Sequence, residues 1–260
     1  MLFLLSPAKS LDYATPLPEA VRAVATRPLF TDRAAELIDL LKPRSAAEVA
    51  QLMDLSADLS ELNVARYAAW SRRHTAQNSR PAAWAFDGDV YDGLAAKTLS
   101  LEDLGWAQDH VVILSGLYGA LRPLDKLQAY RLEMGTALAN PRGRNLYAFW
   151  GDTIAEHLNA RARVDESPVI VNLASQEYFR VADRKALEPR VVDCAFEDWQ
   201  GVGYKVVSFF AKRARGAMAR FAIQHRLAIP AELVAFRDNG YRFAAAVSTP
   251  RRLVFRRRAD

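Results

Sequence analysis

The stretch ILSGLYGALRPLDKLQAYRLEMG, at residues 113–135, constrains the fold of this chain more than any other. Its first two residues are the end of an apolar run at residues 111–114, and this run predicts a buried strand. The polar residues that follow have neither helical nor strand periodicity: Arg122, Asp125, Tyr130, Arg131 and Glu133. Polar side chains on irregular backbone just past a buried strand are typical of a binding or reaction site. The alternative is a loop held by its own ion pairs.

Two other apolar runs end in similar loops. Residues 2–5 predict a buried first strand and residues 169–173 another, and each leads into small and polar residues. Loops at the carboxyl ends of neighbouring parallel strands meet in one crevice. If the three strands are parallel neighbours, the residues that share a pocket are Lys9, Ser115, Tyr118, Asn172 and Ser175. Lys9 is then a phosphate ligand or a reactive amine, and the alternative is an exposed loop lysine.

The predicted fold class is α/β, in the mixed α+β sense, because helices are expected between several buried strands. The sequence contains no repeat, low-complexity tract or Gly/Ser linker. We therefore expect a single compact domain, residues 1–260, with a mixed and largely buried sheet. Ser45 and Glu48 form a capping-box pattern, so residues 46–70 are expected to hold a helix pair that starts with a helix at 46–53.

Metal and nucleophile motifs are absent or ambiguous. Residues 82–86 are predicted as a strand that leads into Asp87-Gly88-Asp89, which either presents two carboxylates or is a plain β-turn. The four histidines lack metal-ligand spacing, and the single cysteine excludes a Cys-based cluster. Because nucleotide-loop, nucleophile-elbow and zincin motifs are also missing, we expect no metal and no cofactor.

Charge is distributed unevenly along the chain. Residues 199–260 carry 13 Lys and Arg against 3 Asp and Glu (13 − 3 = +10), whereas the preceding residues carry 22 against 27 (22 − 27 = −5). A basic C-terminal part indicates a phosphate-bearing partner, above all nucleic acid, and the alternative is a solvated arginine-rich surface. With no export signal, no apolar segment of membrane-spanning length and one cysteine, the chain is expected to be cytoplasmic and without membrane contact.

The most basic element is the predicted helix at residues 211–226. Its cations lie off the apolar stripe of that helix: Lys212, Arg213, Arg215 and Arg220. Cations near a helix N-terminus are slightly unfavourable, and a bound anion would relieve this conflict. We therefore expect these four residues to contact DNA phosphates, or else to form a solvated basic face.

Six motifs together connect the sequence to a known family: Ser6-Pro7-Ala8-Lys9, Gly88-Asp89-Val90-Tyr91, Leu114-Ser115-Gly116-Leu117-Tyr118-Gly119 with Leu121-Arg122-Pro123, Tyr130-Arg131-Leu132-Glu133-Met134-Gly135, Asn172-Leu173-Ala174-Ser175 with Glu177-Tyr178-Phe179, and Arg215-Gly216. Through them, and in this order along the chain, it resembles the YaaA family of bacterial peroxide-stress resistance proteins.

The resemblance implies protection against hydrogen peroxide by limiting free intracellular iron, and hence Fenton damage to DNA. It also implies a mixed α/β domain with a positively charged cleft and a helix–hairpin–helix element that binds duplex DNA. That element would fall on residues 46–70, with its hairpin at residues 59–63, and Asn63 and Arg66 would then contact DNA.

Residues and resemblance together predict a site and a DNA surface. The candidate catalytic residues are Lys9, Tyr118, Arg131 and Glu133. The full predicted pocket contains Ser6, Lys9, Asp89, Tyr91, Ser115, Tyr118, Arg122, Asp125, Tyr130, Arg131, Glu133, Asn172, Ser175 and Tyr178. The predicted DNA contacts are Lys212, Arg213, Arg215, Arg220, Asn63 and Arg66.

Three hypotheses about function follow. The first is a stress protein that binds double-stranded DNA mainly through phosphates, so that salt weakens binding. The second is an enzyme that acts on a nucleobase, a nucleotide or modified DNA, with Glu133 as acid or base and an arginine as anion holder. The third is an iron-binding protein with oxygen ligands among Asp87, Asp89, Asp125 and Glu133.

Overall fold

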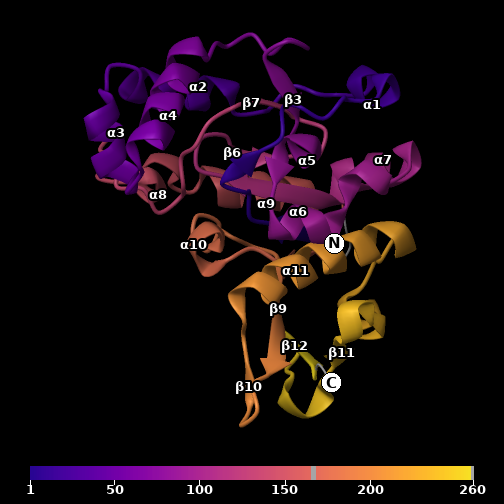
Figure 1. The fold of residues 1–260 in the computed structure, drawn as a ribbon. Coiled ribbons are helices and arrows are strands. Elements are labelled where there is room, and N and C mark those ends of the chain that lie inside the picture. Colours follow the sequence, from indigo (N-terminus) through magenta and orange to yellow (C-terminus); the bar gives the residue numbers. More distant parts are fainter. Residues whose placement is uncertain (165–167, 259–260) are drawn as a thin grey trace.

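A mixed sheet of eight strands forms the centre of the computed structural model, which describes residues 1–164 and 168–258 (Figure 1). The strand order is β11-β12-β9-β8-β1-β5-β6, and β10 pairs with β9. The strands are β1 (Leu2–Leu5), β5 (Val111–Ser115), β6 (Gly119–Leu121), β8 (Val169–Asn172), β9 (Arg190–Trp199), β10 (Tyr204–Lys205), β11 (Arg242–Phe243) and β12 (Arg252–Arg257). The mixed α/β class predicted from the sequence is confirmed.

Parallel pairing dominates the middle of this sheet. Strand β1 lies between β5 and β8 and pairs with both in parallel, with Phe3 opposite Val111 on one side and Val171 on the other. Strand β8 pairs in parallel with β9, and β9 with β12, whereas β6 and β11 run antiparallel at the two edges. Strands buried on both faces read as continuous apolar runs, which is why β1, β5 and β8 could be found in the sequence.

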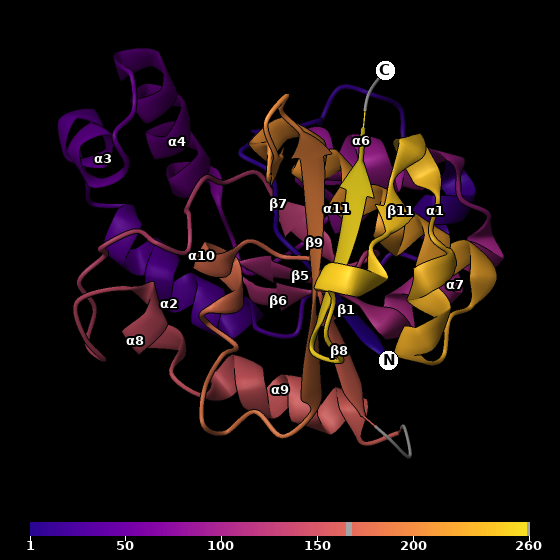
Figure 2. The same ribbon diagram turned by 90° about the horizontal axis from the view of Figure 1, so that it is seen from below.

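Helices cover both faces of the sheet (Figure 2). Helices α6 and α11 lie on one side of β1 and β5, and α9 lies on the other. The helices are α1 (Glu19–Ala23), α2 (Thr31–Leu41), α3 (Ala46–Met53), α4 (Ala57–Ala69), α5 (Ala82–Ala85), α6 (Asp89–Leu94), α7 (Leu101–His110), α8 (Leu146–Trp150), α9 (Thr153–Ala162), α10 (Gln176–Phe179) and α11 (Ser208–His225). Short 3-10 helices lie at Ala96–Thr98, Pro230–Ala235, Asp238–Gly240 and Ala245–Val247.

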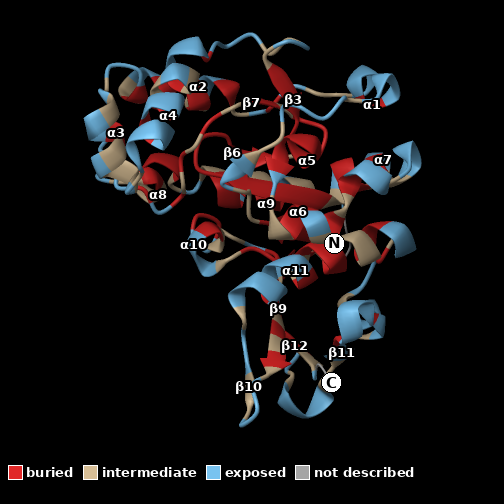
Figure 3. Ribbon diagram, in the orientation of Figure 1, coloured by how far each residue is buried: buried red, intermediate tan, exposed pale blue. Residues whose placement is uncertain are grey.

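The buried residues concentrate in the sheet and on the helix faces that contact it (Figure 3). Helices α3 and α4 project from the body and keep much of their surface exposed. Among residues 1–164 and 168–258, no helix combines the length and the apolar character that a membrane crossing requires.

Two small antiparallel pairs of strands connect loops that lie outside the main sheet. Strand β2 (Ser10–Leu11) pairs with β4 (Phe86–Asp87), and β3 (Ser79–Pro81) pairs with β7 (Lys126–Gln128). The prediction of a strand at residues 82–86 was wrong, because residues 82–85 form the short buried helix α5. A short apolar run has no periodicity that separates a buried strand from a buried helical turn.

The helix pair expected at residues 46–70 is present as α3 and α4. Ser45 and Glu48 make both hydrogen bonds of the capping box at the start of α3. The position predicted for the hairpin was wrong, because residues 59–63 lie inside α4. The turn lies instead at residues 54–56, where Asp54 adopts a left-handed conformation with φ of 53° and Ser56 caps α4.

Helices α6 and α11 cross at very short range through two glycines. A Cβ atom built on Gly216 would lie 1.8 Å from the carbonyl oxygen of Val90, and one on Gly93 would lie 2.0 Å from that of Arg213. Only glycine permits this approach, because any other side chain would overlap backbone atoms of the facing helix. The crossing therefore sets how α11 sits over the carboxyl edge of the sheet.

We expect Gly216→Ala to destabilise the protein by about 1–3 kcal/mol, because the added methyl group must push α11 away from α6. Gly105 in α7 is the matched control, since a Cβ atom there meets nothing within 4 Å. Gly105→Ala should stabilise the protein by about 0.5–1 kcal/mol through helix propensity. Urea unfolding of both variants measures the difference, and equal effects at the two positions would refute the role of the crossing.

Candidate functional site

A cavity of about 380 Å³ opens where strands β1 and β8 end and where α11 crosses α6. The three strands are parallel neighbours, which is the condition set in the sequence analysis, and their pairing brings the ends of β1, β5 and β8 to the same edge of the sheet. Five separate segments contribute to its walls. The lining residues are Ser6, Pro7, Ala8, Lys9, Ser10, Asp87, Gly88, Asp89, Val90, Glu133, Ser175, Glu177, Tyr178, Lys212 and Arg215.

Glu133 lies between two cations in this cavity. Its Oε2 atom is 2.8 Å from Lys9 Nζ, and its Oε1 atom accepts a hydrogen bond of 3.1 Å from Arg131 Nη2. The Glu133 side chain is 23% exposed and that of Lys9 is 64% exposed. Three of the four candidate catalytic residues are thus in direct contact, and Lys9 and Glu133 remain accessible to a ligand.

Hydroxyl groups connect the loops that follow β1 and β8. The backbone N–H of Ser175 donates a hydrogen bond of 2.9 Å to Ser6 Oγ. Tyr91 Oη donates to the carbonyl oxygen of Ser6 at 3.1 Å, which ties α6 to the same loop. Ser175 also caps α10, where its side chain accepts from the N–H of Tyr178. These bonds hold the cavity walls in a fixed relative position.

Helix α11 supplies two further cations. Lys212 Nζ lies 3.8 Å from Asp89 Oδ2, a distance typical of a weak pair, and both side chains are partly exposed. Arg215 is half-buried, and burial lowers the pKa of its guanidinium below the ordinary value. Among the described residues, no carboxylate lies within ion-pair distance of Arg215, and its Nε atom is buried without a hydrogen-bond partner. Arg215 is therefore free to bind a ligand anion.

The lining carries charges of both signs. Its cations are Lys9, Lys212 and Arg215, and its carboxylates are Asp87, Asp89, Glu133 and Glu177. In the part of the chain that the structure describes, no group of three or more His, Cys, Asp or Glu side chains is arranged to hold a metal ion. The four proposed iron ligands are not gathered: Asp125 lies in a different cavity from the other three.

A second set of predicted pocket residues is buried beneath the cavity instead of lining it. Ser115 Oγ and Tyr130 Oη are 2.6 Å apart, and Ser115 Oγ accepts from the N–H of Tyr118. Tyr118 Oη accepts from Trp70 Nε1 at 2.9 Å and from the N–H of Gln128 at 3.1 Å. Burial raises the pKa of Tyr118 to about 12. Tyr118 is therefore a structural residue, and the prediction that it lies in the pocket was wrong.

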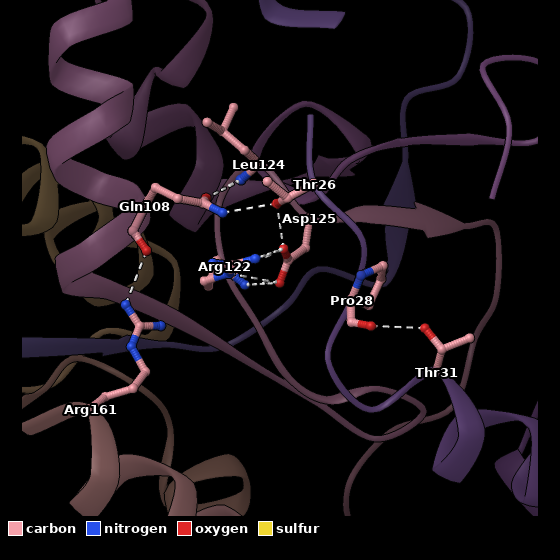
Figure 4. A network of polar contacts seen from close by, with 8 residues as sticks. All are labelled: Thr26, Pro28, Thr31, Gln108, Arg122, Leu124, Asp125 and Arg161. Atoms are coloured by element: carbon pink, nitrogen blue, oxygen red, sulfur yellow. Dashed lines mark hydrogen bonds and ion pairs between the residues drawn. The ribbon is translucent and has the colours of Figure 1, made fainter. Parts of the chain in front are cut away.

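Arg122 and Asp125 form a separate network (Figure 4). Asp125, only 1% exposed, accepts from Arg122 N, Nε and Nη2, and from Thr26 Oγ1. Gln108 donates to Thr26 Oγ1 and accepts from the N–H of Leu124. The network joins α7 to the loop after β6. Arg122 and Asp125 were predicted to lie in the pocket, but they do not line this cavity. This outcome matches the alternative of a loop held by its own ion pairs.

Asn172 is likewise used inside the protein. Its amide donates to Asp193 Oδ1 at 2.8 Å and its carbonyl oxygen accepts from the N–H of Ala174. These bonds join β8 to β9 and shape the start of the loop that carries Ser175. Asn172 therefore positions the cavity wall without lining it.

The predicted DNA contacts fall into two groups. Lys212 and Arg213 are exposed on α11, and Arg66 is half-buried on α4. Asn63 is fully buried and donates to the carbonyl oxygen of Leu59, so it is not available to DNA. Arg220 donates to the carbonyl oxygens of Leu94 and Ala95 and thereby caps α6, so it too serves the fold.

Several lining residues were missed from the sequence. Glu177 accepts from the N–H of Gly135 at 2.8 Å and so connects α10 with the loop that carries Glu133. Its place just after the cap residue Ser175, at the end of a buried strand, was the available signal. Lys212 and Arg215 were predicted as DNA contacts only, because nothing local in the sequence places α11 over the ends of other strands.

Comparisons with known proteins show which sequences this chain is similar to. The family model described as "Peroxide stress protein YaaA" matches residues 1–247. A UPF0246 protein of Leptothrix cholodnii is 62% identical, with 99% of this chain and 98% of the relative covered. The relatives from Variovorax paradoxus and Bordetella pertussis are 61% and 59% identical, each with 99% of both chains covered.

We expect the charged residues of the cavity to contribute little to stability. Glu133→Gln should change the free energy of unfolding by less than about 1 kcal/mol, because partly exposed ion pairs are weak. Asp125→Asn should cost about 2–4 kcal/mol, because it removes a buried carboxylate that accepts several hydrogen bonds. Chemical denaturation of the two variants tests the contrast, and a Glu133→Gln penalty as large as that of Asp125→Asn would contradict it.

Proposed function

This chain belongs to the peroxide stress protein YaaA family, and we propose that it protects cytoplasmic DNA by binding the duplex and helps to limit damage by free iron. The family assignment supports the role in peroxide stress. The observation that carries the proposed DNA binding is the exposed basic part of α11, with Lys212 and Arg213 beside a cavity that also contains Lys9. Arrays of exposed cations are the usual means of contacting DNA phosphates without sequence preference.

Other cations of the C-terminal part contribute less to this proposed surface. Arg252 and Arg256 pair with Glu197, and Arg257 pairs with Asp198. Cations that already face carboxylates add little to the attraction of a polyanion. These ion pairs reduce the basic surface that the net charge of residues 199–260 suggests, and we place the DNA contacts on α11, at Lys212 and Arg213.

Helix α4 is the second proposed contact. Arg66 is half-buried, and burial lowers the pKa of its guanidinium below the ordinary value. Its Nη1 atom donates to Asn63 Oδ1 at 3.3 Å. The turn between α3 and α4 uses the N–H groups of Asp54 and Leu55 for bonds to the carbonyl oxygen of Ala50. We therefore propose Arg66, and not the backbone of this turn, as the contact from the helix pair.

We expect the double variant Lys212→Gln/Arg213→Gln to weaken binding to a duplex of about 20 base pairs by roughly 10- to 100-fold at low salt. The slope of log affinity against log salt should become shallower by about 0.9 for each phosphate that the variant no longer neutralises. Fluorescence anisotropy over a salt series measures both quantities.

The matched control is Arg163→Gln/Lys185→Gln, which removes two exposed charges from outside the proposed surface. This control should bind like the unmodified protein. The proposed DNA function fails if the unmodified protein does not bind duplex, if binding is insensitive to salt, or if both double variants lose affinity equally.

An enzyme is the second candidate function, and the Lys9–Glu133–Arg131 contact favours it. Two cations hold the Glu133 carboxylate in one orientation at the cavity wall, and Lys9 is a neighbouring hydrogen-bond donor. The enclosing cavity and the hydroxyl groups of Ser6 and Ser175 would hold a polar substrate. We propose Glu133 as the acid–base residue and Lys9 as its partner.

Under this second function, Glu133→Gln should reduce turnover by about 10²- to 10⁴-fold, because the amide cannot accept a proton. Survival of peroxide-treated cells that carry only the variant gene is the practical readout. Unfolding and duplex binding of the same variant provide the controls and should change little. Full peroxide survival with Glu133→Gln and with Lys9→Ala would rule out the catalytic candidate and leave duplex binding as the proposed function.

A further inference from the structure

The cavity at the carboxyl edge of the sheet differs from a plain phosphate site in its charge. Sites that hold phosphate alone are lined by cations and N–H groups. Here three cations face four carboxylates, and Glu133 is the carboxylate most firmly positioned among them. Carboxylates accept hydrogen bonds from exocyclic amino groups of bases and from sugar hydroxyls, but they repel phosphate. The lining therefore suits a ligand that has both an anionic group and hydrogen-bond donors.

The charged residues come from different walls, and both signs of charge meet at each wall, where Lys212 lies 3.8 Å from Asp89 and Lys9 lies 2.8 Å from Glu133. Arg215 and Lys212 come from α11, whereas Glu133 and Lys9 come from the loops that follow β7 and β1. Arg215 has no carboxylate partner among the described residues, and a guanidinium fork matches two oxygens of a phosphate. The wall formed by α11 is thus the natural place for the anionic end of the ligand.

Size and apolar contacts narrow the ligand further. A volume of about 380 Å³ lies near the lower limit of small-molecule sites, roughly 300–1,000 Å³, which fits one nucleotide and not a longer strand. Pro7, Ala8, Val90 and Tyr178 contribute apolar surface between the charged walls. A planar base could contact these groups while its polar edge meets Glu133.

We propose that this cavity binds one nucleoside monophosphate unit, with its phosphate on Arg215 and Lys212 and its base or sugar on Glu133 and Lys9. The same chemistry has two sources, a free nucleotide or a single nucleotide displaced from the DNA duplex. The inference deepens the enzyme candidate by naming its ligand class. Only the DNA source depends on the proposed duplex binding, because a free nucleotide needs no DNA surface.

The first arm of the test uses free ligands. Titration calorimetry with each of the four deoxynucleoside monophosphates should give saturable binding to the unmodified protein for at least one base. Inorganic phosphate and the corresponding nucleoside should each bind about tenfold or more weakly, a difference of about 1.4 kcal/mol. If phosphate alone binds as tightly as the nucleotides, or if no nucleotide binds at millimolar concentration, the inference is wrong for free nucleotides.

Variants then locate the binding. Arg215→Lys and Lys212→Gln should each weaken nucleotide binding about tenfold or more, and Glu133→Gln should change the order of preference among the bases. Lys212 is exposed, so its substitution tests whether the α11 wall binds the phosphate even if Arg215→Lys alters folding. Arg163→Gln is the control and should leave affinity within about twofold. Equal losses for Arg163→Gln and Lys212→Gln would place binding outside the cavity.

The second arm uses DNA. A duplex with one unpaired nucleotide should bind about tenfold more tightly than the matched duplex, and Glu133→Gln should abolish this preference. Preference for the unpaired nucleotide supports the DNA source, and its absence together with nucleotide binding assigns the cavity to free nucleotides. Loss of both signals overturns the inference, whereas loss of matched-duplex binding alone overturns the proposed DNA function and leaves nucleotide binding standing.

Discussion

The parallel pairing of β1 with both β5 and β8 is the constraint on which the rest of the structure depends. Phe3 lies opposite Val111 in one neighbour and Val171 in the other, so the two pairings fix the register of all three strands. Since a one-residue slip would exchange the faces of every side chain, the loops at residues 6, 116 and 173 must start at the same edge. The cavity exists because the loops that follow β1 and β8, distant in the sequence, are held together there beside Glu133, α6 and α11.

Polar residues near this edge have two distinct roles. Ser115, Tyr118 and Tyr130 are buried at the end of β5, bond one another, and hold irregular backbone in one conformation. Lys9 and Glu133, which line the cavity, stay partly exposed, and among the described residues their ion pairs are Lys9 with Glu133 and Glu133 with Arg131. A buried group with every bond satisfied has no capacity left for a ligand, so the site is confined to the residues that line the cavity.

Sequence reasoning succeeded where a local pattern was sufficient. The capping box at Ser45 and the apolar runs of β1, β5 and β8 are each contained within a few residues, and all four elements were predicted. Sequence reasoning failed where contacts between distant segments determine the position of a residue. The start of α4 was missed because Ser56 caps it within a largely polar stretch, and the place of Arg215 depends on the crossing of Gly216 with α6. Tyr118 and Glu133 both lie in the stretch at residues 113–135, yet only their tertiary partners separate a structural residue from a candidate site residue.

The net charge of a segment overstates its attraction for anions when its arginines are already paired with acids in the fold. The excess of cations in residues 199–260 suggested an extended basic surface, yet several of these arginines are stacked on aromatic rings or paired with acids. Arg256 lies 4.4 Å from the ring centroid of Tyr204 and also bonds Glu197, and Arg257 lies 4.8 Å from that of Tyr241 and bonds Asp198. Such arginines stabilise the β9–β12 region and are largely neutralised there. The net charge of this region is therefore a poor guide to its surface, because only the cations without an acid partner can attract an anion, and Arg215 is one of these that lines a cavity.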